Sequence, residues 1–175
     1  MMDIHFTTRP ETEKDRRAIA EVHARAFGRE HEAQLVERLR QGLRFVPDLS
    51  LVALYRGEVI GHILFYPVDV VNGEKAVESL ALAPVAVLPE HQRKGVGSIL
   101  IRQGLEAAKR LRFNSVTVLG HPEYYPRFGF QPASRWKIKA PFAGAEQALF
   151  ALELREGVLG HSGGTVQYPG EFEGV

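Results

Sequence analysis

Residues 85–98 read VAVLPEHQRKGVGS, and the interpretation of the whole chain starts from them. An apolar run leads into a loop with two glycines, and the amphipathic stretch that follows predicts a helix over about 95–112. Glycine permits a positive backbone φ and leaves room for a ligand close to the main chain. The first N–H groups of a helix have no acceptor within it and carry the positive end of its dipole. The segment therefore predicts a site for a phosphate-bearing ligand.

Basic residues gather around this loop. Between residues 91 and 112 the only acid is Glu106, against six basic residues: Arg93, Lys94, Arg102, Lys109, Arg110 and Arg112. The dinucleotide fingerprint G-x-G-x-x-G is not met, because Leu100 stands where its third glycine is needed. The P-loop pattern is absent as well. We therefore expect an anionic ligand, and not a nucleotide that is bound through one of these two motifs.

Composition excludes several classes of protein. The 175 residues are 45% hydrophobic and 25% charged, which is typical of one ordered domain with a substantial core. A net charge of +1 argues against a protein that coats nucleic acid, and the lack of cysteine excludes disulfides, thiolate metal sites and a cysteine nucleophile. The seven histidines are dispersed, so no metal site is expected. With no transmembrane run and no signal-peptide pattern at the N-terminus, a cytoplasmic protein is expected.

The pattern along the chain predicts a mixed α/β fold. A weak strand is expected at 2–7, and Thr12 with Asp15 resembles a capping box that opens the first helix. The region 76–88 is expected to be a strand that Pro84 interrupts as a bulge or splayed edge, and a Gly-rich, irregular tail is expected from about residue 157. The other expected elements are helices at 13–27 and 30–42, strands at 51–55, 59–65, 115–119 and 147–155, a short helix after 122, and extended chain at 128–130. This order predicts one central sheet with helices on both faces.

Three motifs within the run from Pro84 to Pro132 resemble the GNAT N-acetyltransferase superfamily, and its YhbS-like bacterial subgroup in particular. Residues 92–97, QRKGVG, match the acyl-CoA loop Q/R-x-x-G-x-G/A. Residues 85–89, VAVLP, are similar to the strand that binds pantetheine, and residues 125–130, YPRFGF, fit the element Y-x-x-x-G-F. The resemblance implies a single acetyltransferase domain with a mostly antiparallel, splayed sheet.

The resemblance also implies roles for individual residues. Backbone N–H groups of the loop would hold the CoA pyrophosphate, Gln92 would shape the entry of the loop, and Tyr125 would protonate the departing thiolate. The backbones of Val85 and Val87 would pair with pantetheine, and the N–H of Val85 or Ala86 would polarise the thioester carbonyl. The loop residues are Arg93, Lys94, Gly95, Val96, Gly97 and Ser98.

The general base is left open. Ala81 occupies the position where some members of the superfamily carry a glutamate, eleven residues before the loop glutamine. Substitutes by residue type are Glu78, His62, His121 and Glu123, and a water chain is a further alternative.

The sequence thus predicts an acetyl-CoA-dependent N-acetyltransferase that acts on an amine of a small molecule or peptide, as a monomer or homodimer. The resemblance implies direct attack of the amine in a ternary complex. The lack of cysteine removes the commonest covalent route, while a serine ester stays open. Two alternatives stay open: a non-catalytic module that binds acyl-CoA, suggested by Ala81, and an enzyme that transfers a longer acyl group.

Overall fold

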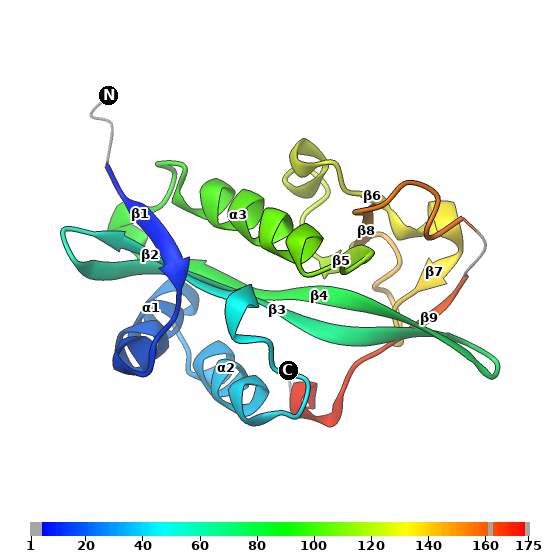
Figure 1. Cartoon of the computed structure of the whole chain (residues 1–175), viewed down its shortest axis with the longest axis horizontal. Helices are drawn as coiled ribbons and strands as arrows, with labels where there is room; N and C mark the ends of the chain where they lie inside the picture. The colour runs from blue at the N-terminus through cyan, green and yellow to red at the C-terminus, as the bar shows by residue number, and fades with distance from the viewer. Residues whose placement is uncertain (1–4, 161–162, 174–175) are drawn as a thin grey trace. The chain divides into compact units, whose positions relative to one another are not determined.

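The computed structural model describes residues 5–160 and 163–173 (Figure 1). They fall into two compact units. The first comprises the described parts of 1–65, 83–107 and 171–175. The second comprises 66–82 and the described parts of 108–170. The chain crosses from one unit to the other four times, within two strands, one α-helix and the short 3₁₀ turn Gly170–Phe172. Such shared elements are unlike a boundary between domains, which falls in exposed connecting segments.

The helices and strands are bounded as follows. The helices are α1 (Arg16–Phe27), α2 (His31–Gln41) and α3 (Val96–Arg110). The strands are β1 (Thr7–Pro10), β2 (Ser50–Tyr55), β3 (Glu58–Asn72), β4 (Lys75–Val87), β5 (Ser115–Leu119), β6 (Gln131–Pro132), β7 (Ile138–Lys139), β8 (Leu149–Glu153) and β9 (Gly164–Gln167). Within the described residues, no helix has the length and apolar character needed to cross a membrane.

In the first unit, β1, β2 and the first half of β3 pair in antiparallel fashion. One face of these strands packs on α3. A Cβ at Gly61 would lie 3.1 Å from Leu100 and 3.2 Å from Val96. The Phe65 ring, four residues further along β3 on the same face, occupies the place where a Cβ of Gly104 would stand. Small residues at 61 and 104 therefore allow the helix to lie close to the strand.

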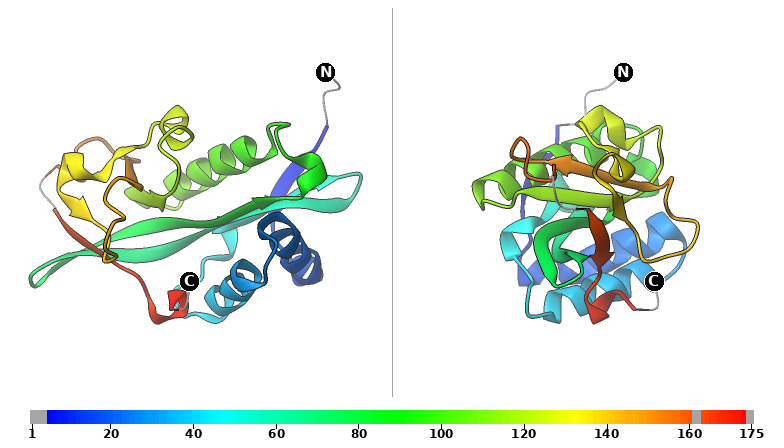
Figure 2. Two further views of the ribbon diagram at one scale, coloured as in Figure 1. Left: turned by 180° about the vertical axis from the view of Figure 1, so that it is seen from behind. Right: turned by 90° about the vertical axis from the view of Figure 1, so that its right-hand side faces the viewer.

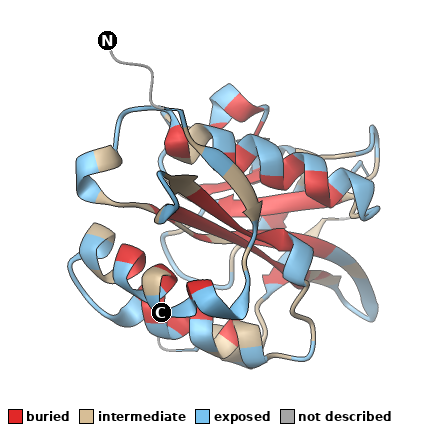
Figure 3. Ribbon diagram, turned by 60° about the vertical axis from the view of Figure 1, so that its left-hand side comes forward, coloured by how far each residue is buried: buried red, intermediate tan, exposed pale blue. Residues whose placement is uncertain are grey.

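The opposite face packs on the first two helices. Ile19 of α1, Val36 of α2 and Val52 of β2 form one buried cluster. Figure 3 shows buried positions on the strands and on the inward sides of the helices, with exposed positions on their outer sides. Helices therefore cover both faces of the strands, as the sequence predicted.

The second unit contains a pair of parallel strands with antiparallel neighbours. β4 and β5 pair at Leu80↔Val116 and Ala81↔Thr117, and this register ends there although β5 continues to Leu119. β5 pairs along its whole length with β8, and β8 pairs with β6. Near the red end of the colour scale, β9 returns to pair with the second half of β3 (Figures 1 and 2). The mostly antiparallel sheet that the resemblance implied is confirmed, whereas the parallel pairing of β4 with β5 was not predicted.

Several predicted elements were wrong in extent. The first strand lies at 7–10, not at 2–7, and residues 2–4 of the predicted range lie outside the described residues. β4 is one strand through Pro84, so the proline does not interrupt it, but the pairing with β5 ends at Ala81, just before Pro84, in agreement with the splayed edge expected there. The tail is not wholly irregular, because it contains β9. Each error concerns pairing with a distant segment, which local patterns do not encode.

Candidate active site

Two hydrogen bonds hold the start of the loop that follows β4, one to β3 and one to the end of β4. The Leu88 N–H donates to the Ile60 carbonyl of β3 at 2.9 Å. The Gln92 side-chain amide donates to the Val87 carbonyl, also at 2.9 Å. These two bonds turn the chain away from the strand and set the direction in which the loop enters α3. Sequence reasoning expected Gln92 to shape this entry, and its hydrogen bond is suited to that task.

Two residues of the loop have left-handed backbones. Arg93 has φ 61° and Gly95 has φ 86°. A non-glycine residue in this region is uncommon, and strained backbones gather at functional sites. Arg93, Lys94 and Gly95 are all exposed. The tight turn therefore presents its backbone and two cationic side chains to solvent.

The loop ends at the N-terminus of α3. The Ile99 N–H donates to the Gly95 carbonyl at 3.1 Å, which is the first bond of the helical pattern. The N–H groups of Val96, Gly97 and Ser98 precede it and have no acceptor inside the helix. Together with the positive end of a 15-residue helix, they form a site suited to an anion.

The last residues of β4 lie beside the same loop. Val85 and Val87 are partly buried, whereas Ala86 between them is buried. The Ala86 carbonyl oxygen would lie 3.3 Å from a Cβ at Gly61, so β3 and β4 approach closely here. The structure thus brings Val85, Ala86 and Val87 together with the loop residues 92–98 in one unit.

Tyr125 belongs to the second unit, where it begins a short 3₁₀ turn, Tyr125–Phe128. It is 8% exposed and packs edge-to-face on Phe130, with ring centroids 5.7 Å apart. Burial, and to a lesser extent neighbouring Tyr124, raises the pKa of Tyr125 to about 12. The phenol therefore stays protonated at neutral pH and is able to donate a proton.

Gly120 is a residue that sequence reasoning did not single out. A Cβ at this position would overlap the Tyr125 ring, which lies directly on the glycine backbone. Only glycine leaves this space free. The Gly-His-Pro break after β5 was visible in the sequence, but the contact with Tyr125 was not. Gly120 therefore sets the position of the tyrosine ring.

The candidates for a general base are not equivalent. Glu78, His121 and Glu123 are exposed. His62 is fully buried in β3, and Ala81, where some members of the superfamily were expected to carry a glutamate, is buried as well. Among the described residues, no cluster of three His, Cys, Asp or Glu side chains is able to hold a metal ion.

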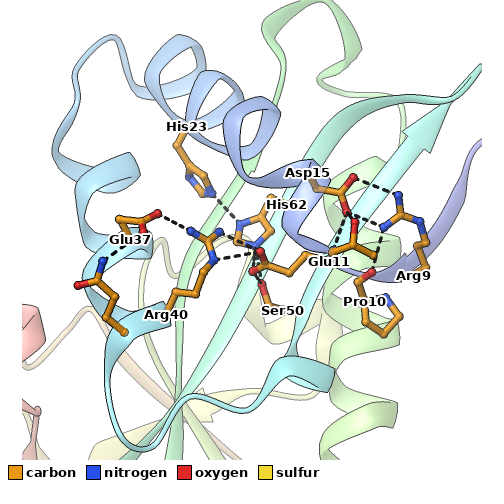
Figure 4. A network of polar contacts seen from close by, with 11 residues as sticks. Arg9, Pro10, Glu11, Asp15, His23, Glu37, Arg40, Ser50 and His62 are labelled. Atoms are coloured by element: carbon orange, nitrogen blue, oxygen red, sulfur yellow. Dashed lines mark hydrogen bonds and ion pairs between the residues drawn. The ribbon is translucent and has the colours of Figure 1, made fainter.

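A buried polar chain in the first unit was not foreseen (Figure 4). His23 Nε2 lies 2.8 Å from His62 Nδ1, and His62 Nε2 lies 2.8 Å from Ser50 Oγ. The Ser50 hydroxyl donates to Glu11 Oε1, and Arg40 forms an ion pair with Glu11 Oε2 at 2.9 Å. These groups come from α1, β3, β2, the segment after β1, and α2. The sequence offered no signal for the chain beyond the type of each residue.

Buried histidines make the stability of this protein depend on pH. Burial, then the charges of His62 and Arg40, lowers the pKa of His23 from 6.5 to about 2, and burial lowers the pKa of His62 as well. Between these limits the unfolded chain binds protons that the folded chain does not. The free energy of unfolding should therefore have its highest value above pH 6.5 and should fall as the pH drops toward 2. The loss is up to about 1.4 kcal/mol per histidine for each pH unit.

Urea unfolding at several pH values checks this expectation. His23→Gln should flatten the dependence below pH 6.5, because a titrating group is removed. His5→Gln, at an exposed position, should leave the dependence unchanged. Equal slopes in the wild type and His23→Gln would contradict the assignment.

The described geometry agrees with comparisons to known proteins. The profile of the acetyltransferase (GNAT) domain matches residues 7–133. YjhQ from Escherichia coli K12, named an uncharacterized N-acetyltransferase, is 43% identical over 130 residues, which cover 74% of this chain and 72% of the relative. YhbS from the same strain, named in the same way, is 34% identical over 149 residues, which cover 85% of this chain and 87% of YhbS.

Solved structures show the same fold. The crystal structure of Escherichia coli YhbS in complex with CoA superimposes with a TM-score of 0.90 at 29% identity, covering 98% of this chain and 94% of that chain. A GNAT acetyltransferase from Brucella melitensis in complex with acetyl-CoA gives a TM-score of 0.79 at 30% identity, covering 97% and 99%. The family, the fold and the enzyme class predicted from the three motifs are confirmed. The chain belongs to the acetyltransferase (GNAT) family.

Proposed function

We propose that this protein binds acetyl-CoA and transfers its acetyl group directly to an amine of a small molecule or peptide. The observation that carries the proposal is the loop at the start of α3. There, the left-handed backbones of Arg93 and Gly95 lead into free helix N–H groups. This arrangement suits a pyrophosphate. The relatives solved with CoA and acetyl-CoA support the identity of the ligand.

The remaining site residues serve the transfer. The loop residues 92–98 hold the pyrophosphate, and the backbones of Val85 and Val87 pair with the pantetheine amides. An N–H group of Val85 or Ala86 donates to the thioester carbonyl as negative charge develops on its oxygen. Tyr125, protonated at neutral pH, donates a proton to the sulfur.

The reaction is a direct displacement. The amine nitrogen forms a bond to the carbonyl carbon, the carbon–sulfur bond breaks, and the sulfur leaves with the proton from Tyr125. The amine loses one proton, and the phenol regains one, so that CoA thiol and an N-acetyl amide are the products. The chain has no cysteine to carry the acetyl group as a thioester, which favours a ternary complex.

An assay of CoA release tests the proposal. The protein is mixed with acetyl-CoA and a panel of primary amines: polyamines, amino-acid amides and short peptides. At least one amine should raise the release of free thiol above the rate of hydrolysis. Initial rates at varied concentrations of both substrates should give intersecting reciprocal plots, as a ternary complex requires. Parallel plots would contradict direct transfer.

A second candidate function is a non-catalytic module that binds acyl-CoA. The buried Ala81, in place of the superfamily glutamate, favours it. Tight binding of acetyl-CoA by calorimetry, with no thiol release from any amine, would support the module and contradict the enzyme. Equal or faster release from a longer acyl-CoA would instead identify a longer acyl donor.

A further inference from the structure

Contacts of its ring determine where the Tyr125 side chain lies. The Gly120 backbone lies directly against this ring, and Phe130 packs on it edge-to-face with centroids 5.7 Å apart. Tyr124, the preceding residue, also packs edge-to-face, and its ring centroid is closer, at 5.2 Å. Pairs of this kind favour a defined orientation of the two rings. The position of the phenol oxygen therefore depends on the position of Tyr124.

Arg127 holds Tyr124 through two kinds of contact. Its guanidinium carbon lies 4.6 Å from the centre of the Tyr124 ring, within the range of a cation–π interaction. Its Nε donates to the Tyr124 carbonyl at 3.0 Å, and its Nη2 donates to the Glu123 carbonyl at 3.4 Å. One side chain thus fixes both the backbone and the ring of the residue before Tyr125.

The turn around Tyr125 leaves a carbonyl that the Arg127 side chain is able to satisfy. Tyr125 begins the 3₁₀ turn, and residue 126 is a proline. In the 3₁₀ pattern a carbonyl accepts from the N–H three residues later, so the Glu123 carbonyl would need an N–H on residue 126. Proline has none. The guanidinium therefore supplies a hydrogen bond that the backbone of the turn cannot make.

The three side chains form a layer that runs from solvent inward. Arg127 is exposed, Tyr124 is partly buried, and Tyr125 is buried. All three belong to the second unit, as does Gly120. The Tyr125 ring is thus in contact with Gly120 and with a Tyr124 ring that an exposed cation holds.

We propose that Arg127 is a positioning residue for the acetyl transfer. It fixes Tyr124, and the Tyr124 ring in turn keeps the Tyr125 phenol where it protonates the departing sulfur. The inference rests on the proposed function and adds to it a residue that acts through its neighbour. A proton donor must lie within hydrogen-bond reach of the atom that it protonates. A misplacement of about 1 Å is able to cost about 100-fold in rate.

Kinetics of Arg127→Met test the proposal. Methionine keeps an unbranched side chain but removes the charge over the ring and both donors. At saturating acetyl-CoA, kcat should fall about tenfold or more, yet by no more than in Tyr125→Phe, because a displaced phenol transfers its proton poorly. Affinity for CoA, measured by calorimetry, should not change. The matched control is Arg135→Met, since Arg135 is exposed too and its guanidinium lies 5.3 Å from the Trp136 ring centre. It should match the wild type.

A double variant separates positioning from general damage to the turn. Once Tyr125→Phe has removed the phenol, no proton is left to position, so the addition of Arg127→Met should slow the enzyme by less than about twofold. If Arg127→Met slowed the wild type and the Tyr125→Phe variant by the same factor, Arg127 would act on the fold alone and the proposal would be wrong. Unchanged kcat in Arg127→Met would also contradict it.

A second variant keeps the test independent of how well Arg127→Met folds. Tyr124→Leu retains both backbone hydrogen bonds of Arg127 but removes the ring between the guanidinium and Tyr125. Its kcat should fall about tenfold or more as well, and this loss should also disappear in the Tyr125→Phe background. Wild-type activity in Tyr124→Leu would show that the Tyr124 ring does not position the phenol.

Failure of this proposal differs from failure of the proposed function. If Tyr125→Phe kept full activity, Arg127 would have no phenol to position, while acetyl transfer by the wild type still stood. If the wild type bound CoA but acetylated no amine, the proposed function itself would fail, and the role of Arg127 with it.

Discussion

Gly97→Glu is expected to weaken CoA binding at least about 100-fold, or by about 2.8 kcal/mol. Gly97 is the second residue of α3, beside the free N–H groups proposed to hold the pyrophosphate. A carboxylate there would compete for these groups and repel the phosphates. The fold should not suffer, because an acidic side chain in the first turn of a helix interacts favourably with its dipole. Isothermal titration calorimetry with CoA measures the change.

Position 97 gives a cleaner test than position 95. Gly95 has φ 86°, so any side chain there would strain the turn in addition to blocking the site. Gly97→Ala is the matched control, since it adds a methyl group without charge and should cost less than about tenfold in affinity. Arg93→Ala should also have a smaller effect than Gly97→Glu, because backbone groups supply most of the contact. Unchanged affinity in folded Gly97→Glu would show that this loop does not bind the cofactor.

Tyr125→Phe is expected to lower kcat about 10²–10⁴-fold at saturating acetyl-CoA, the range typical of general acid catalysis. The change removes one hydroxyl and retains the ring that packs on Phe130. Because the proton is needed in the transition state, affinity for acetyl-CoA should hardly change. Steady-state kinetics together with calorimetry separate these two effects.

Two further variants accompany this prediction, one as a control and one that displaces the Tyr125 ring. Tyr124→Phe should keep its activity, since the hydroxyl of this neighbour has no assigned role. Gly120→Ala places a methyl group where the Tyr125 ring lies, so kcat should fall although the phenol is still present. Full activity in Tyr125→Phe, with damage only in Tyr125→Ala, would assign the tyrosine a packing role.

The loop at 92–98 and α3 were predictable because their signals are local. Gly95 and Gly97 permit the turn and the close approach of a ligand, and apolar residues at helical spacing determine the buried side of α3. The position of the helix is correct, although its end at Arg110 lies two residues before the predicted one. The bond from Gln92 to Val87 spans only five residues, so the expected role of this glutamine also follows from neighbouring sequence.

Strand pairing over long distances was not predictable in the same way. β9 pairs with β3 across nearly 100 residues, and its Gly-rich sequence reads as irregular. Its strand conformation depends on backbone hydrogen bonds to a partner that is far away in the chain.

The sequence by itself determined the family, because each of its three motifs is contiguous in the chain, and the resemblance nominated the loop 92–98 and Tyr125 as the candidate cofactor site and acid. Only the tertiary structure decided which groups surround them. His23 and His62 are 39 residues apart, so their contact has no sequence signature. The contact of Gly120 with the Tyr125 ring has none either, because glycine has no side chain that would indicate it. A buried polar chain needs donors and acceptors from several elements at hydrogen-bond distance, and packing of the helices on the strands sets those distances.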